Sequence, residues 1–515
     1  MAIKKPTIEQ LKKIAEEFYL DISCEDLVSF QEIISAGPLQ SYDRLNEMNE
    51  PTLTVKYPRT LGYRPPNEEN KYNAWYWKTS IKGNGIGNLA GKKVVLKDNI
   101  NLAGIPMMNG SAMLEGYVSN EDATIVTRML DEGADIVGKA VCQDLCLSGG
   151  SHTAATGPVR NPHDLTKSTG GSSSGSAALV AAGEVDMAIG CDQGGSIRIP
   201  SSWCGIYGLK PSYGLVPYTG ILPIERTIDH AGPMAKTVED IALLLEVIAG
   251  EDGLDSRQSG LESKPYVQSL TGNANGVKVG VVKEGFNWEG VSEEDVDRIV
   301  KESANYLIHA GALVEEISIP MHRDGIHLWN VIGTEGLTSL MVKENGMGTN
   351  WKGHYTTRFL DIYGKSRKTR ANEFAQTVKL TMLLGQYMQD QYNGKYYAVA
   401  QNIARKLKQA YDIAFEKYDV LIMPTTPMKA TTIPSPGISI AEDISNSLGM
   451  IQNTAPFNLT GHPAMNVPCG KSGKLPVGMM IVGRIGEDDK VIQVAHAFEQ
   501  LDKTKVACGL EQVNR

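Results

Sequence analysis

The stretch from residue 167 to residue 217 constrains this chain most, because glycine and serine are denser there than anywhere else in the sequence. It contains two islands, residues 170–176 (GGSSSGS) and residues 192–198 (DQGGSIR). The run between them is first rich in alanine, which favours a buried helix, and then becomes a short apolar strand. A loop, a helix and a strand in this order would return the two serine-bearing turns to one place.

The second island has the residue types that acyl transfer requires. Gly194 and Gly195 precede Ser196, so the backbone can approach a ligand closely and direct its N–H groups toward one point. N–H groups beside a hydroxyl nucleophile form an oxyanion hole, usually the largest electrostatic contribution to acyl transfer. Ser196 is therefore a candidate nucleophile that needs a base. Taken alone, these residues are more often an ordinary glycine–serine turn.

The two islands, followed by residues 204–211 (CGIYGLKP), resemble the long and specific signature of the amidase signature family. The resemblance implies a catalytic set of a serine, a second serine preceded by a cis peptide bond, and a lysine. In this sequence the nucleophile falls on Ser196 and the second serine on Ser172. The lysine falls on Lys97, at the end of an apolar run over residues 93–97 that is typical of a buried strand.

This resemblance also implies how the three residues divide the work. Lys97 takes a proton from Ser172, which takes one from Ser196, and the relay later returns the proton to the leaving amine. Lys97 must be neutral to act as a base, so we expect burial to lower its pKa below the ordinary value of about 10.4. We expect an oxyanion hole made of four backbone N–H groups, those of Gln193, Gly194, Gly195 and Ser196.

Within the family, the sequence is most similar to bacterial enantioselective amidases found beside nitrile hydratases, on residues 149–152 (GGSH), 217–220 (PYTG) and 224–230 (IERTIDH). Alignment with that branch implies an acyl pocket that would favour small aliphatic or aromatic groups. Its lining would be Leu147, Ile228, Trp329 and Ile451, four residues that are equally compatible with ordinary core positions. Three further residues are expected to support the site without reacting: Ser173, Asp192 and Arg198. Asp192 and Arg198 would hold the serine loop, with Asp229 as a further partner.

Two other catalytic or nucleotide motifs fit less well. Residues 171–175 match the G-x-S-x-G elbow of α/β-hydrolases, but the preceding residues resemble a loop and not a strand. Residues 85–90 match the loose form of a dinucleotide fingerprint, but they precede a strand and do not join a strand to a helix.

No metal or cofactor is expected. Cys142 and Cys146 are four residues apart, as helix neighbours often are, and no second pair lies at zinc spacing. His322 and His327 lack the glutamate of a two-histidine zinc motif. We expect the two cysteines to serve as buried packing.

Composition narrows the class of protein. A net charge of −9 argues against nucleic-acid and acidic membrane partners. The chain has no run of 18 apolar residues and no apolar signal region at its N-terminus, and its seven scattered cysteines suit a reducing compartment. We therefore expect a soluble cytoplasmic protein. The resemblance to the amidase signature family implies that its partner is a small-molecule amide or carbamate substrate.

Short apolar runs alternate with helical segments over residues 91–320, which indicates an α/β fold. The resemblance implies a central mixed twisted sheet flanked by helices. We expect four regions: an N-terminal helical region (1–70), the first part of the core (71–325), a small helical cap (326–405) and the second part of the core (406–515). A helix with a capping box is expected over residues 7–19, and an extended connection over residues 40–90. The apolar stripes of the N-terminal helices suit packing on the main body or on a second copy of the chain, in a homodimer.

The predicted activity is hydrolysis of the C–N bond of small amides to a carboxylic acid and ammonia or an amine. Carbamates and anilides follow the same acyl-transfer path, so a urethanase or aryl-acylamide hydrolase is a close alternative. The amidase component of a transamidosome is disfavoured by the extended N-terminal region and the full cap. A non-catalytic binding protein is disfavoured by the presence of Lys97, Ser172 and Ser196, and a membrane-bound fatty-acid amide hydrolase by the lack of a hydrophobic anchor.

Overall fold

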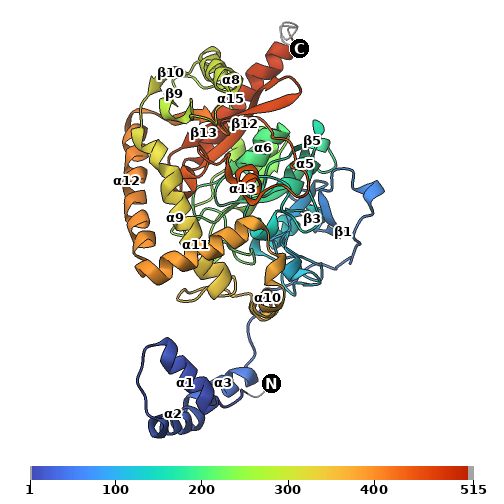
Figure 1. Cartoon of the computed structure of the whole chain (residues 1–515). Helices are drawn as coiled ribbons and strands as arrows, with labels where there is room; N and C mark the ends of the chain where they lie inside the picture. Colours follow the sequence, from blue (N-terminus) through green and yellow to red (C-terminus); the bar gives the residue numbers. More distant parts are fainter. Residues whose placement is uncertain (1–2, 508–515) are drawn as a thin grey trace. The chain divides into compact units, whose positions relative to one another are not determined.

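The computed structural model describes residues 3–507, and the chain forms two compact units, one ending at Leu53 and one beginning at Thr54. The first unit contains α1 (Ile8–Glu17), α2 (Cys24–Ala36) and α3 (Pro38–Glu47) (Figure 1). The expected capping box at the start of α1 is confirmed, because Gln10 N donates to Thr7 Oγ1 over 3.1 Å and Thr7 N donates to Gln10 Oε1 over 2.8 Å.

The second unit is built on one large mixed sheet. In spatial order its strands are β1 (Trp75–Lys82), β3 (Asp135–Ala140), β2 (Lys93–Lys97), β6 (Met187–Asp192), β8 (His230–Ala235), β7 (Tyr207–Lys210), β12 (Ala464–Ser472), β13 (Leu475–Gly483), β11 (Val420–Pro424), β9 (Lys278–Val282) and β10 (Leu313–Ile317). A separate two-stranded sheet pairs β4 (Arg160–Asn161) with β5 (Asp164–Ser168).

Strand direction determines which residues can meet at the site. β2 runs parallel to β6, with Leu96 opposite Ile189. Carboxyl ends of neighbouring parallel strands lie at the same edge of a sheet. The end of β2, which carries Lys97, therefore lies beside the end of β6, where the second glycine–serine island begins.

Helices cover both faces of this sheet, since every residue of β6, β7, β8 and β11 is buried. α5 and α6 pack on each other and on the sheet, while α7 and α15 pack on each other and on the sheet and α4 packs on α7. The helices of this unit are α4 (Thr124–Asp131), α5 (Ser174–Ala182), α6 (Arg198–Cys204), α7 (Val238–Ile248), α8 (Glu294–Tyr306), α9 (Gly325–Leu337), α10 (Thr357–Thr369), α11 (Gln376–Tyr392), α12 (Lys395–Lys417), α13 (Ile440–Leu448), α14 (Pro456–Thr460) and α15 (Asp488–Ala507). The expected central mixed sheet flanked by helices is confirmed.

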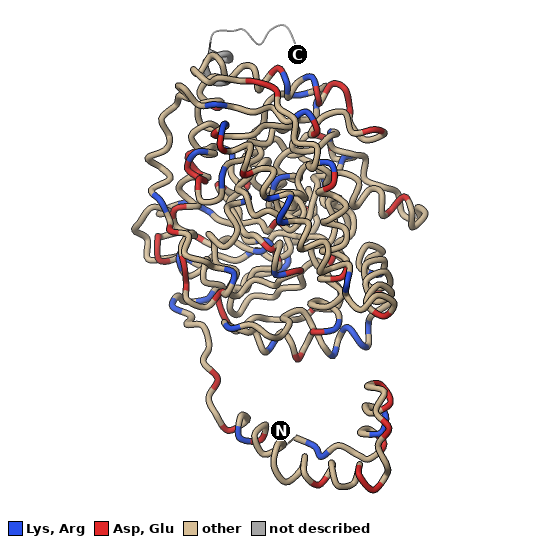
Figure 2. Tube along the Cα trace, turned by 90° about the vertical axis from the view of Figure 1, so that its left-hand side faces the viewer, with Lys and Arg blue, Asp and Glu red and all other residues tan. Residues whose placement is uncertain are grey.

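The stretch expected to form a cap is helical, from α9 to α12. The region boundaries at residues 70, 325 and 405 stay predictions. Figure 2 shows acidic and basic residues interspersed along the trace of both units, so the net negative charge does not come from one segment.

The expected extended connection over residues 40–90 is wrong in two places. α3 covers residues 38–47, and Pro38 suits its first turn because that position needs no N–H donor. β1 pairs antiparallel with β3, joining the core sheet from a segment whose sequence is largely polar. Pairing across the fold, which local composition does not reveal, determines this strand.

Candidate active site

Lys97 and Ser172 meet in the interior of the second unit. Lys97 is the last residue of β2, and both side chains are fully buried. Its Nζ donates to Ser172 Oγ over 2.8 Å and to the carbonyl oxygen of Cys191 over 3.1 Å. The peptide bond between Gly171 and Ser172 is cis. The structure thus joins the lysine and the second serine that the sequence singles out.

Ser196 lies in the loop between β6 and α6 and lines a cavity. Its carbonyl oxygen accepts a hydrogen bond of 3.2 Å from Ser173 N. The Ser173 hydroxyl bonds the backbone of Cys191, donating to its oxygen over 3.2 Å and accepting from its nitrogen over 3.3 Å. Ser173 therefore ties the two serine loops together at the end of β6.

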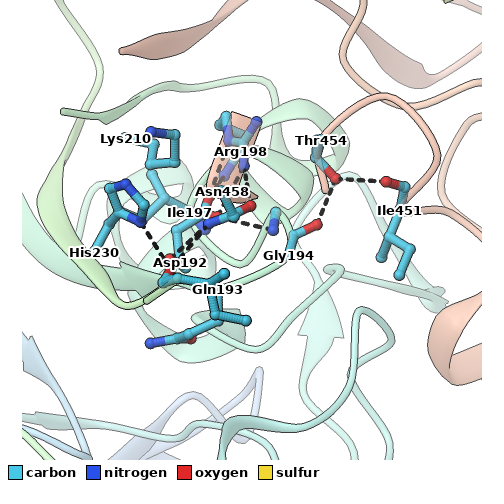
Figure 3. A network of polar contacts seen from close by, with 12 residues as sticks. Asp192, Gln193, Gly194, Ile197, Arg198, Lys210, His230, Ile451, Thr454 and Asn458 are labelled. Atoms are coloured by element: carbon cyan, nitrogen blue, oxygen red, sulfur yellow. Dashed lines mark hydrogen bonds and ion pairs between the residues drawn. The ribbon is translucent and has the colours of Figure 1, made fainter. Parts of the chain in front are cut away.

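Asp192 anchors the loop that leads to Ser196 (Figure 3). Its carboxylate accepts from Arg198 Nε and Nη2 over 3.0 and 2.9 Å, and from Asn458 Nδ2 over 2.8 Å. Burial raises the pKa of this carboxyl, but the charge and hydrogen bonds of Arg198 outweigh burial and hold the pKa well below its usual range. Asp229 contacts the loop at another point, since it pairs with Arg257 over 2.9 Å and accepts from Gln193 Nε2 over 3.1 Å.

Two side chains hold the carbonyl groups of this loop. Trp329 Nε1 donates to the oxygen of Gln193 over 2.6 Å. Thr454 Oγ1 donates to the oxygen of Gly194 over 2.6 Å (Figure 3). In a planar trans peptide the N–H points opposite to the C=O of the preceding residue. The two contacts therefore fix the directions of the N–H groups of Gly194 and Gly195.

The N–H of Gly195 is already engaged, because it donates to Asp192 Oδ1 over 2.8 Å. Gln193, Gly194 and Ser196 remain as candidate oxyanion donors. A side chain at either glycine of this loop would collide with the residues that hold the loop. A Cβ added to Gly194 would lie 2.8 Å from the Trp329 ring. A Cβ added to Gly195 would lie 2.3 Å from Thr454 Oγ1. Gly195 also has φ of +135°, which favours glycine.

The cavity beside Ser196 brings together all four residues predicted to line an acyl pocket. Leu147, Ile228, Trp329 and Ile451 line it together with Gln193, Gly194 and Ser196. The four hydrophobic side chains are 1–8% exposed, so the cavity is bounded by residues that also belong to the core.

Sequence reasoning missed the place of Cys146, for which it predicts only a packing role. Cys146 lines the cavity and also contacts Lys97 and Ser172. Leu145 and Cys146 both have left-handed backbone conformations, with φ of 46° and 61°. Consecutive left-handed residues other than glycine are rare, and spacing alone offers no signal for them.

The thiols around Lys97 change its expected protonation. Burial lowers the pKa of the ammonium, but the nearby thiols of Cys146, Cys191 and Cys142 raise it when they ionise, and the net direction is upward. Our expectation of a lowered pKa is therefore wrong.

The three thiols differ in how readily they ionise. Burial raises the pKa of Cys191 to about 12 and that of Cys142 well above its usual value. For Cys146, burial raises the pKa, but hydrogen bonding from Cys142 and the charge of Lys97 outweigh it and lower the pKa to about 7. Cys146 is thus the thiol that can be ionised beside Lys97 near neutral pH.

The comparison with known families decides the class of protein. The family described as Amidase matches residues 64–492. This chain belongs to the amidase signature family. It is accordingly a hydrolase acting on amide C–N bonds.

Similar proteins support this assignment over most of the chain. An enantioselective amidase of Rhodococcus rhodochrous is 43% identical, covering 97% of this chain and 96% of that protein. A glutamyl-tRNA(Gln) amidotransferase subunit of Geobacillus thermodenitrificans is 37% identical, covering 97% and 98%. The crystal structure of the peptide amidase from Stenotrophomonas maltophilia is similar with a TM-score of 0.65 and 28% identity, covering 80% and 83%.

Two features are absent from residues 3–507. These residues include no cluster of three or more histidine, cysteine, aspartate or glutamate side chains that could hold a metal ion. Nor does any helix among them have both the length and the apolar character needed to cross a membrane.

Replacing Arg198 with methionine should destabilise the fold strongly. The change leaves the fully buried Asp192 carboxylate without its countercharge, which costs roughly 3–5 kcal/mol of unfolding free energy. Denaturant unfolding measures this loss. The matched control is Arg298→Met, at an exposed ion pair with Glu302, which should change stability little. Equal stability of the two variants would contradict the anchoring role of Arg198.

Proposed function

We propose that this enzyme hydrolyses small aliphatic or aromatic amides through an acyl-enzyme formed on Ser196, with Ser172 as the proton relay and Lys97 as the base. The observation that carries the proposal is the hydrogen bond between Lys97 and Ser172, which are both buried. Both also contact Cys146, which lines the cavity together with Ser196. A buried amine and a hydroxyl in contact can move a proton without exchange with bulk water.

In the first half of the reaction, Ser196 Oγ forms a bond with the amide carbon and gives its proton to Ser172, whose own proton passes to Lys97. The carbonyl oxygen becomes an oxyanion that the N–H groups of Gln193, Gly194 and Ser196 stabilise. The C–N bond then breaks, and the proton returns through Ser172 to the leaving nitrogen. Water repeats the sequence on the ester, which releases the carboxylic acid and free Ser196.

The apolar lining of the cavity supports small uncharged acyl groups. The similarity to an enantioselective amidase over nearly the whole chain points in the same direction. Carbamates and anilides remain alternatives, because they form the same oxyanion and differ in the group that leaves. Similarity to amidotransferase subunits favours a second candidate, an amidase component that works only with partner proteins.

Purified protein alone should release ammonia from acetamide, propionamide and benzamide, and Ser196→Ala should abolish turnover while leaving the melting temperature unchanged. Losing one oxygen removes the nucleophile, while the contacts of Asp192 and Thr454 still hold the loop. Ethyl carbamate and acetanilide, the latter read by aniline release, complete the panel. Turnover by the alanine variant would exclude the nucleophile assignment, and wild-type protein inactive on every substrate would favour the partner-dependent component.

Replacing Cys146 with alanine should extend activity toward lower pH. In the proposed mechanism Lys97 must be deprotonated, and the Cys146 thiolate raises its pKa. Removing that negative charge lowers the lysine pKa relative to that of the wild type, because burial then meets less opposition, so the acid limb of the profile of kcat/KM against pH moves down. Cys469→Ala, at a half-buried thiol outside the site, is the control. An acid limb that stays in place or moves upward would contradict this coupling.

We further propose a cytoplasmic homodimer. The six described cysteines are free thiols, which suits a reducing compartment. In the N-terminal unit, Phe30, Ile33 and Leu45 are 50–63% exposed, and exposed apolar side chains on adjacent helices suit contact with a second copy. Light scattering should therefore give a molar mass of two chains, and F30E/I33E should give that of one with unchanged activity per chain. A wild-type mass of one chain would exclude the dimer.

A further inference from the structure

The side chain of Gln193 is buried and held in one orientation. It is 3% exposed, and its Nε2 donates to Tyr218 Oη over 2.8 Å and to Asp229 Oδ1 over 3.1 Å. Asp229 is paired with Arg257 and also accepts from Ile224 N, so it presents an acceptor to Gln193. An amide facing a carboxylate must direct its nitrogen there, which turns its oxygen the other way.

That oxygen is unused. Among the described residues, none donates a hydrogen bond to Gln193 Oε1, although the atom is buried. A buried carbonyl oxygen without a donor is destabilising, and native proteins rarely contain one. Gln193 lines the cavity together with Ser196, into which a substrate would enter under the proposed function.

Among the residues that line the cavity, Gln193 is the one whose polar side chain can recognise a polar group of the substrate. Most lining side chains are hydrophobic, including Leu147, Ile224 and Ile228. Ser148 Oγ already accepts from Gly150 N over 3.1 Å, and the Cys146 sulfur is engaged by Asn109, Lys97 and Ser172. An apolar cavity with one oriented acceptor selects ligands that place a donor against it.

We propose that Gln193 Oε1 accepts a hydrogen bond from an N–H or O–H group of the bound substrate, which makes Gln193 a specificity-determining residue. The inference rests on the proposed function, since the ligand is the amide that Ser196 attacks. The donor is either the N–H of the leaving amide or a hydroxyl or amino group on the acyl part. Both sources satisfy the same acceptor, and matched substrates separate them.

The test measures kcat/KM of Gln193→Met for four substrates: propionamide, 2-hydroxypropanamide and their two methyl esters. Methionine matches the length of glutamine and has no carbonyl acceptor. We expect roughly a tenfold or larger additional loss of kcat/KM on substrates that carry the donor, because the variant leaves that donor without its acceptor. A loss confined to the two amides identifies the leaving N–H, and a loss confined to the two hydroxy substrates identifies the acyl group.

Tyr218→Phe is the matched control, because it removes a partner of Nε2 and leaves Oε1 in place. It should change all four substrates by one common factor. The same uniform factor in Gln193→Met, or no change at all, would overturn the proposal. Gln193→Leu replaces the methionine variant if that variant has a lowered melting temperature. Ser196→Ala is assayed alongside, since turnover in that variant refutes the proposed function itself and not the role of Gln193.

Discussion

The ion pair between Asp192 and Arg198 is the interaction on which the site depends. Both side chains are completely buried, where an unpaired charge is very costly. Asn458 bonds both members, donating to Asp192 over 2.8 Å and accepting from Arg198 over 2.8 Å. With its charges and lone pairs satisfied, this cluster can occupy the interior and hold the short loop from β6 to α6 in one conformation.

Preorganisation of the loop follows from this anchor and from the carbonyl contacts of Trp329 and Thr454. These residues come from α9 and from the segment before α14, far from the loop in sequence. The N–H group of Gly194, one of the candidate oxyanion donors, therefore acquires its direction from packing between distant parts of the core. Donors fixed before the substrate arrives need no reorganisation during the reaction, which is the basis of electrostatic stabilisation in enzymes.

Much of this arrangement could be predicted from the sequence, because it depends on local patterns. The strand ending at Lys97 and the helix after the first serine island follow from local apolar runs. The support of the loop by Asp192 and Arg198 could be predicted because both residues lie within the signature. The contacts of Thr454 and Asn458 could not be predicted, since they depend on packing between distant segments. The left-handed backbone at Leu145 and Cys146, likewise, is imposed by tertiary structure on residues with no local preference for it.

The surroundings of Lys97 show why burial alone is a poor guide to a catalytic base. A lysine buried among neutral groups would lose its proton readily, but here one thiol with a pKa of about 7 lies in contact with it. Ammonium with thiolate and amine with thiol carry the same net charge, so a proton can shift between Lys97 and Cys146 without creating a new buried charge. In the proposed mechanism this exchange supplies the neutral amine that Ser172 requires. The basicity of Lys97 then depends on Lys97 and Cys146 together, and it follows from the position that the backbone gives to Cys146.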